Sequence, residues 1–171
     1  MNISDTYNYL IRARRDLWAV LENVPDEILS RPLLGDAWFP CLKDLLFHII
    51  TVEDGWLNMD ILRRDPVLEN FPALRDAAEG AACGFPLGSL HDYWQAVEKS
   101  TLEYLAKLSD DELKRVTTPH DDPEQHRFTV DSLLWHVLIH EMRHTAQIVT
   151  LLRMQGIKPP SLDLLFYLPS S

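Results

Sequence analysis

The chain lacks the features of disulfide-rich and membrane-spanning proteins. Only two cysteines occur, Cys41 and Cys83, which is too few for a disulfide framework, so we expect two reduced thiols. No window approaches the ~18 consecutive apolar residues of a membrane-spanning helix. The first ten residues also lack a basic stretch followed by an apolar run. We therefore expect a soluble, cytoplasmic protein with no membrane partner.

Positive charge is also scarce. The sequence has 16 Lys and Arg against 26 Asp and Glu, which gives a formal net charge of −10 at pH 7. Binding to nucleic-acid phosphates needs concentrated Lys and Arg, and the densest basic cluster is only residues 12–15. We therefore expect no nucleic-acid partner.

The chain does have enough apolar residues for one well-buried core. It contains 171 residues, of which 46% are hydrophobic, and this length is usual for one domain. No internal repeat with a period of about 20–50 residues is present. We expect a single domain spanning residues 1–171.

Apolar residues recur at helical spacing in four long stretches, residues 5–23, 40–64, 89–108 and 131–155. Pro40 suits the first turn of the second helix, Ser89 with Asp92 resembles a capping box for the third, and Thr129 can cap the fourth. Residues 66–88, rich in Pro and Gly, show no sustained period. The pattern predicts an all-α fold, namely a four-helix bundle with a long crossover after the second helix.

Three shorter elements are also expected. Residues 25–29 could form one helical turn, and residues 116–129 could pair as a small irregular hairpin. After Gly156, the apolar residues 162–168 are expected to pack back on the bundle.

Two histidines lie on the apolar face of the fourth predicted helix. At about 100° per residue, His140 and His144 share a face with Val137 and Ile148, so both should point into a core. Residues four apart on a helix have Cβ atoms roughly 5–6 Å apart, from which two imidazoles can converge on one metal ion. His136 lies about 40° to one side of His140 and is the weaker candidate.

A third inward histidine, His48, lies on the apolar stripe of the second predicted helix. Asp44, one turn earlier, could accept the second ring N–H of His48 or could be exposed. Three protein ligands with an open position are typical of a reactive metal site. The alternative is three histidines that each find separate hydrogen-bond partners. A buried ring nitrogen without a partner costs about 1–3 kcal/mol, and a bound metal would remove that cost.

The segment from His140 to His144 also matches H-E-x-x-H, a metalloprotease pattern. One large group of such proteases would need Gly and His where this chain has Gln147 and Thr150. The glutamate ligand of the other group is missing, because no Glu follows Glu141. The sequence therefore disfavours a protease.

Several short motifs occur in a familiar order. They are LLFHII around His48, Glu-x-x-Trp from Glu53, H-x-x-x-H-x-x-Q-I from His140, and G-x-x-P-P-x-x-D-x-x-x-Y from Gly156. In this order and spacing the chain resembles the DinB/YfiT-like superfamily. The resemblance extends over most of the chain.

This resemblance implies a four-helix bundle that binds a divalent metal, often zinc or nickel, through three histidines, here His48, His140 and His144. Characterised relatives include S-transferases that use bacillithiol or mycothiol, so it also implies a thiol-dependent S-transferase acting on a small molecule. The alternatives are a metal-dependent hydrolase and a non-enzymatic, metal-stapled stress-response protein. Glu53 and Glu141 are the nearest candidate carboxylates, and no catalytic residue is assigned.

The fourth predicted helix is apolar on nearly all sides, which indicates burial on more than one face. A homodimer is one explanation. The C-terminal segment or the second helix of the same chain is the other. The residues roughly opposite the two histidines are Trp135, Leu138, Met142, Ala146 and Val149.

Overall fold

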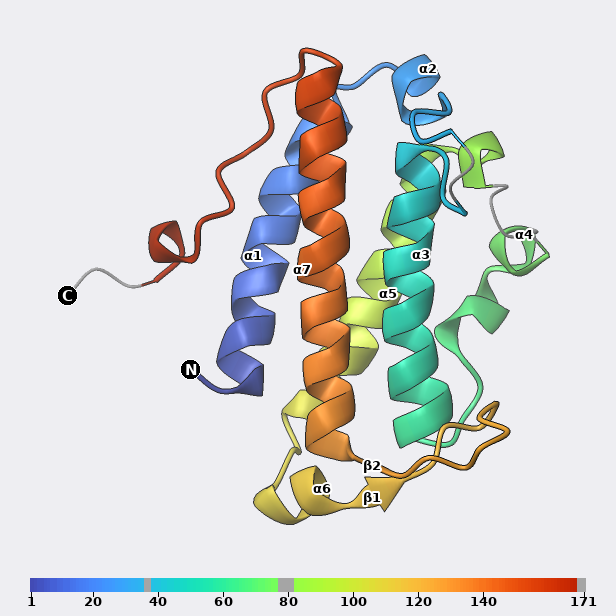
Figure 1. Cartoon of the computed structure of the whole chain (residues 1–171), viewed down its shortest axis with the longest axis vertical. Coiled ribbons are helices and arrows are strands. Elements are labelled where there is room, and N and C mark those ends of the chain that lie inside the picture. Colours follow the sequence, from blue (N-terminus) through green and yellow to red (C-terminus); the bar gives the residue numbers. More distant parts are fainter. Residues whose placement is uncertain (36–37, 77–81, 169–171) are drawn as a thin grey trace.

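Four long helices lie alongside one another in the computed structural model, which describes residues 1–35, 38–76 and 82–168 (Figure 1). They are α1 (Ile3–Leu21), α3 (Leu42–Asp54), α5 (Leu87–Leu105) and α7 (Val130–Met154). The axis of α3 continues into a π-helical segment, η1 (Gly55–Ile61). The predicted all-α four-helix bundle is confirmed.

The directions of the helices explain the crossover. In Figure 1, α1 and α7 run upward, whereas α3 and α5 both run downward. The chain must therefore return along the outside of the bundle between η1 and α5. Its described parts include the short helices η2 (Val67–Asn70), α4 (Pro72–Arg75) and η3 (Ala82–Gly84). The predicted crossover after the second long helix is present.

Four smaller elements lie at the ends of the bundle, namely α2 (Asp26–Leu29), α6 (Asp110–Lys114) and the antiparallel strands β1 (Val116–Thr117) and β2 (Phe128–Thr129). The short helix η4 (Leu164–Phe166) lies beside α1 instead (Figure 1). The predicted turn and hairpin are thus both present. Among the described residues, no helix is long and apolar enough to cross a membrane.

The C-terminal segment packs back on α1, as expected. The Tyr9 hydroxyl donates to the Leu162 carbonyl oxygen at 2.6 Å, and the Tyr167 hydroxyl donates to the Asp16 carboxylate at 2.6 Å. The rings of Tyr9 and Tyr167 meet edge to face, with centroids 5.4 Å apart. These contacts tie the tail to the first helix.

Several predicted helix boundaries were wrong. Pro40 does not lie in the first turn of the second long helix, because α3 begins at Leu42 with Cys41 as its N-cap. Ser89 does not cap α5, because the helix begins at Leu87 directly after Pro86, whose φ of −58° already suits a helical start. The second long helix ends at Ile61 rather than residue 64, because Arg63 has a φ of 56°, outside the helical region. The Thr129 cap is confirmed by its side chain, which accepts from the Ser132 N–H at 3.2 Å.

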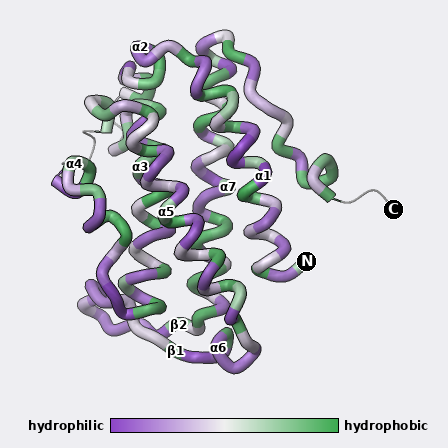
Figure 2. The backbone as a smooth tube through the Cα atoms, turned by 180° about the vertical axis from the view of Figure 1, so that it is seen from behind, coloured by the Kyte–Doolittle hydropathy of each residue, from purple (hydrophilic) through white to green (hydrophobic). Residues whose placement is uncertain are grey.

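Apolar side chains form two buried clusters, one toward each end of the bundle. One cluster includes Leu21, Leu42 and Leu152, and the other includes Ile3 and Val130. Hydrophobic and hydrophilic residues alternate along each long helix in Figure 2, as expected for amphipathic helices that bury one side.

A layer of buried polar residues lies between these clusters, and Arg14 is its centre. The guanidinium of Arg14 on α1 donates to Glu141 on α7 at 2.8 and 3.1 Å, to Glu53 on α3 at 3.2 Å and to Glu98 on α5 at 3.0 Å. Tyr7 also donates to the Glu53 carboxylate, at 2.5 Å. One cation thus joins all four long helices.

The charge state of this layer follows from its surroundings. Burial alone would lower the pKa of Arg14, but the carboxylates of Glu141 and Glu53 raise that pKa well above its ordinary value. Burial also raises the pKa of Glu141, against the opposing effect of Arg14. The guanidinium therefore stays charged and depends on its carboxylate partners for compensation.

Arg14→Met should destabilise the protein by about 3–5 kcal/mol, because it leaves buried carboxylates without their cation. Urea unfolding followed by circular dichroism measures this change. The matched control is Arg15→Met on the same helix, where the side chain is 71% exposed and 3.8 Å from Glu98. It should cost less than about 0.5 kcal/mol. Equal losses in the two variants would contradict a structural role for the Arg14 layer.

Candidate metal centre

The structure brings His48, His140 and His144 together. His48 comes from α3, and the other two come from successive turns of α7. One ring nitrogen from each residue lies within 4.8 Å of the other two, and the Nε2 atoms of His48 and His140 are 3.0 Å apart. His140 and His144 are buried, while His48 is half-buried. The three inward positions predicted from helical periodicity therefore meet at one point.

This donor set fits a divalent metal. Nitrogen ligands of a tetrahedral zinc ion lie about 3.3 Å from one another, given bonds of about 2.0–2.1 Å. The separations here, 3.0 Å between His48 and His140 and no more than 4.8 Å within the group, span that value. Metal ligation also requires neutral imidazoles. Burial, with the neighbouring charges of His144 and Arg143, lowers the pKa of His48 to about 4, and burial with the same neighbours and His48 lowers that of His140 to about 3. Both rings are neutral at pH 7.

Gln147 orients the third imidazole. Its side-chain oxygen lies 2.6 Å from Nδ1 of His144. Because an amide oxygen only accepts, Nδ1 carries the hydrogen and Nε2 of His144 keeps its lone pair. Such a partner commonly fixes a ligating histidine in the correct tautomer. The sequence pattern placed Gln147 near His144 but assigned it no role, although its position one turn after His144 was a usable signal.

Asp44 does not have the role considered for it. The carboxylate of Asp44 accepts from the Ala82 N–H at 2.9 Å and from the Cys41 thiol at 3.0 Å, and the residue is 2% exposed. It therefore neither orients His48 nor faces solvent. Its position one turn before His48 was insufficient evidence, because the crossover supplies a backbone donor that sequence periodicity does not reveal.

Phe39 borders the histidine group and was missed. Its ring stacks on His48 with centroids 3.9 Å apart and meets His144 edge-on at 6.4 Å. The residue lies in the loop before α3, where no periodicity applies. The only sequence signal was its place next to Trp38, directly before Pro40. Phe39 covers one side of the site with an apolar surface.

His136 lies beside the group rather than in it. Its ring centroid is 5.9 Å from His140 and 5.2 Å from Trp56, and the residue is exposed. The metal-competent group found in the described part of the chain contains His48, His140 and His144 only. His136 therefore lies outside the candidate metal centre.

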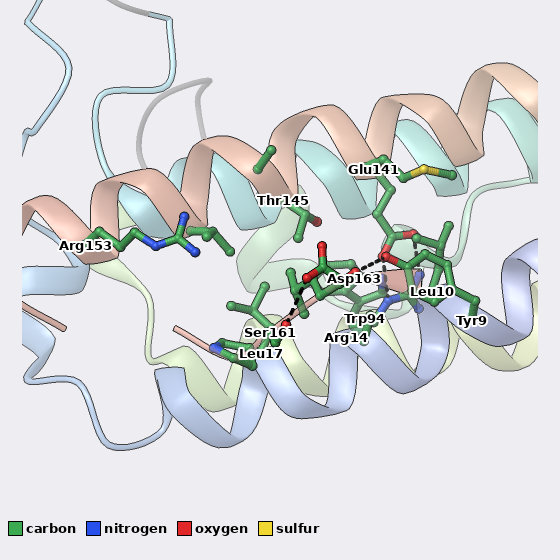
Figure 3. A pocket seen from close by; sticks show the side chains of 16 residues that line it. Tyr9, Leu10, Arg14, Leu17, Trp94, Glu141, Thr145, Arg153, Ser161 and Asp163 are labelled. Atoms are coloured by element: carbon green, nitrogen blue, oxygen red, sulfur yellow. Dashed lines mark hydrogen bonds and ion pairs between the residues drawn. The ribbon is translucent and has the colours of Figure 1, made fainter. Parts of the chain in front are cut away.

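The two candidate carboxylates face away from the histidines. Glu141 reaches from α7 toward Arg14 on α1 (Figure 3), and Glu53 accepts hydrogen bonds from Arg14, Tyr7 and Thr101. Both are buried. Neither side chain is therefore free to act as a base beside the imidazoles, so Glu141 does not have the role of the glutamate in H-E-x-x-H.

A separate cavity of about 320 Å³ lies on the side of α7 that faces Arg14, between α1, α7 and the C-terminal segment (Figure 3). Arg14 and Glu141 are among its lining residues, together with Arg153 and Asp163. None of the three clustered histidines lines it. Helix α7 therefore lies between two different environments. One contains the three clustered histidines, and the other contains the ion pair of Arg14 with Glu141.

We expect about one divalent metal ion per chain, measured by plasma mass spectrometry on purified, metal-loaded protein. Alanine at His48, His140 or His144 should weaken metal affinity by more than about 100-fold, because each change removes a ligand rather than an outer partner. His136→Ala should have a milder effect and serves as the matched control. Full occupancy in His48→Ala would contradict this assignment.

Solved structures with similar folds support the architecture. A conserved protein from Enterococcus faecalis has a TM-score of 0.70 at 18% identity, covering 90% of this chain and 96% of its own. A DinB-like protein from Bacillus cereus has a TM-score of 0.60 at 19% identity, covering 93% and 94%. YfiT from Bacillus subtilis, described as a probable metal-dependent hydrolase with an unusual four-helix bundle topology, has a TM-score of 0.66 at 18% identity, covering 91% and 89%.

The sequence itself identifies the family. A comparison with proteins of curated function finds no match. The family model described as "DinB family", however, matches residues 1–171. This chain therefore belongs to the DinB family.

Proposed function

We propose that this DinB-family protein is a metal-dependent enzyme that transfers a small thiol to an electrophilic small molecule. The observation that carries the proposal is the convergence of three neutral imidazoles from two helices, with no carboxylate in the metal-competent group of the described residues. Three protein ligands leave a position for a reactant. Zinc or nickel is the proposed metal.

Each residue of the site has a distinct part. His48, His140 and His144 would hold the metal, and Gln147 keeps the lone pair of His144 Nε2 available. Phe39 shields the His48 ring from solvent on its stacked face. A bound divalent metal would favour the deprotonated form of a thiol or water, which is then a stronger nucleophile.

The lack of a free base favours thiol transfer over hydrolysis. A thiolate is already nucleophilic once formed, whereas hydrolysis commonly uses a general base to handle protons of the attacking water and the leaving group. Glu53 and Glu141 cannot supply that base, because both bind Arg14 on the far side of their helices. Among the residues that the structure describes, the metal-competent group therefore contains no carboxylate.

Hydrolysis is the second candidate. It is supported by the similar fold of YfiT, which is described as a probable metal-dependent hydrolase. A purely structural metal is a weaker candidate, because structural zinc sites usually use four protein ligands. The group found in the described part of the chain offers three, one of them half-buried.

Metal-loaded protein should accelerate conjugation of bacillithiol, mycothiol or glutathione to a model electrophile such as monobromobimane, measured by fluorescence. His144→Ala should abolish the acceleration, because it removes a metal ligand. His126→Ala, an exposed residue in the loop between β1 and β2, should leave the rate unchanged. If no thiol is consumed faster than in buffer, while p-nitrophenyl esters are hydrolysed only with metal present, the hydrolase replaces the transferase.

A homodimer is part of the proposal. The far face of α7 is covered only in part by its own chain. Leu138 and Val149 are buried, whereas Trp135 and Met142 are half-buried and Ala146 is exposed. Large apolar residues on that segment remain open, with Leu165 79% and Phe166 70% exposed. A second chain could cover them.

Light scattering at micromolar concentration should therefore give twice the 19.8 kDa mass of the chain. Leu165→Ser with Phe166→Ser should shift the protein toward the monomer without unfolding it, because both side chains are exposed. A wild-type particle of 19.8 kDa would rule out the dimer.

A further inference from the structure

Arg143 lies beside the candidate metal centre. It precedes His144 on α7 and follows His140 by three residues, so it falls on the same side of the helix. Its Nη2 is 3.2 Å from Nε2 of His144, and its side chain belongs to an exposed residue. The guanidinium therefore lies directly beside the nitrogen that His144 would offer to a metal.

No acid balances this cation in the described part of the chain. Arg14, by contrast, binds three carboxylates, and Arg115 forms an ion pair with Glu112 at 2.7 Å. Arg143 forms no ion pair with a described residue. A divalent metal would add two further positive charges, and the metal-competent group of the described residues contains no carboxylate to offset them. This excess favours an anionic ligand at the site.

The hydrogen bond to His144 indicates where that anion would lie. Nε2 of His144 is the acceptor for Arg143, and it is also the atom left free for a metal by the Nδ1 contact with Gln147. Metal ligation takes this lone pair, so the guanidinium loses its acceptor. Its donors then remain next to the reactant position, on a side chain that solvent can reach.

We propose that Arg143 forms an anion subsite beside the metal position and that the protein's small-molecule reactant carries a carboxylate. This inference rests on the proposed metal-dependent function. The planar guanidinium offers paired N–H donors that match the two oxygens of a carboxylate. Phe39, against His48 and His144, supplies an apolar surface at the same site. Arg143 is a specificity-determining residue in this assignment.

Cobalt-loaded protein tests the subsite through its visible absorption bands, without any need for turnover. Anaerobic titration compares 3-mercaptopropionate with 2-mercaptoethanol, two small thiols of which only the first carries a carboxylate. Wild-type protein should bind the acid about 10-fold more tightly, the value of one charge-assisted hydrogen-bonded contact. Arg143→Gln should lose this preference while its cobalt bands before titration match those of wild type. Arg143→Lys should retain part of it.

The matched control is Arg153→Gln, an exposed arginine on the same helix that lines the separate cavity. It should keep the wild-type preference. A preference that is absent in wild type, or that survives in Arg143→Gln, overturns the anion subsite.

The remaining outcomes separate this inference from the proposed function. If wild-type protein shows no cobalt bands, the metal centre fails and the subsite fails with it. If cobalt binds but neither thiol shifts the bands, thiol coordination fails, and calorimetric titration with acetate against acetamide decides the subsite. Acetate binding that weakens in Arg143→Gln supports the subsite, and no difference between the two probes overturns it.

Discussion

The network of hydrogen bonds and ion pairs around Arg14 is the interaction on which the rest of the bundle depends. Arg14 on α1 contacts carboxylates from α3, α5 and α7, and these are buried with it between two apolar clusters. Apolar surfaces alone tolerate sliding of one helix along another, because burial is not directional. A guanidinium with fixed donor directions does not. The network therefore sets the register of all four helices at one level.

The histidine group takes its geometry from this register. Glu53 and His48 both belong to α3, and Glu141 and His140 are neighbours on α7. Each helix thus presents a carboxylate toward Arg14 and an imidazole toward the other helix. The H-E-x-x-H sequence of α7 places a glutamate that binds Arg14 directly after a histidine of the candidate metal centre. The two side chains point in different directions, because adjacent residues of a helix are about 100° apart around its axis. The glutamate consequently contributes to the structural network, and the histidines form the candidate metal centre.

Local patterns allowed much of this to be predicted from the sequence. The four long helices follow from apolar periodicity, and the inward direction of His48, His140 and His144 follows from the same period. The buried role of Arg14 could not be predicted in this way, because Arg14 stands between Arg12 and Arg15 in a helix whose charged residues normally face solvent. Only carboxylates from three other helices make its burial tolerable. Phe39 was equally hidden, since its contact depends on how a loop folds across α3.

A buried ion network contributes little net stability compared with apolar residues of similar volume, so its main consequence here is directional. If α7 slid along α3 by one helical turn, about 5.4 Å, Glu141 would leave Arg14 and His140 would leave His48 in the same movement. The first separation exposes an unpaired charge to a low-dielectric interior, which is costly. The second separation disperses the imidazoles, which costs much less in the absence of a metal. The contact between Arg14 and Glu141 therefore also keeps His48 and His140 together. As a result, three neutral nitrogen donors can stay close to one another before any metal ion binds.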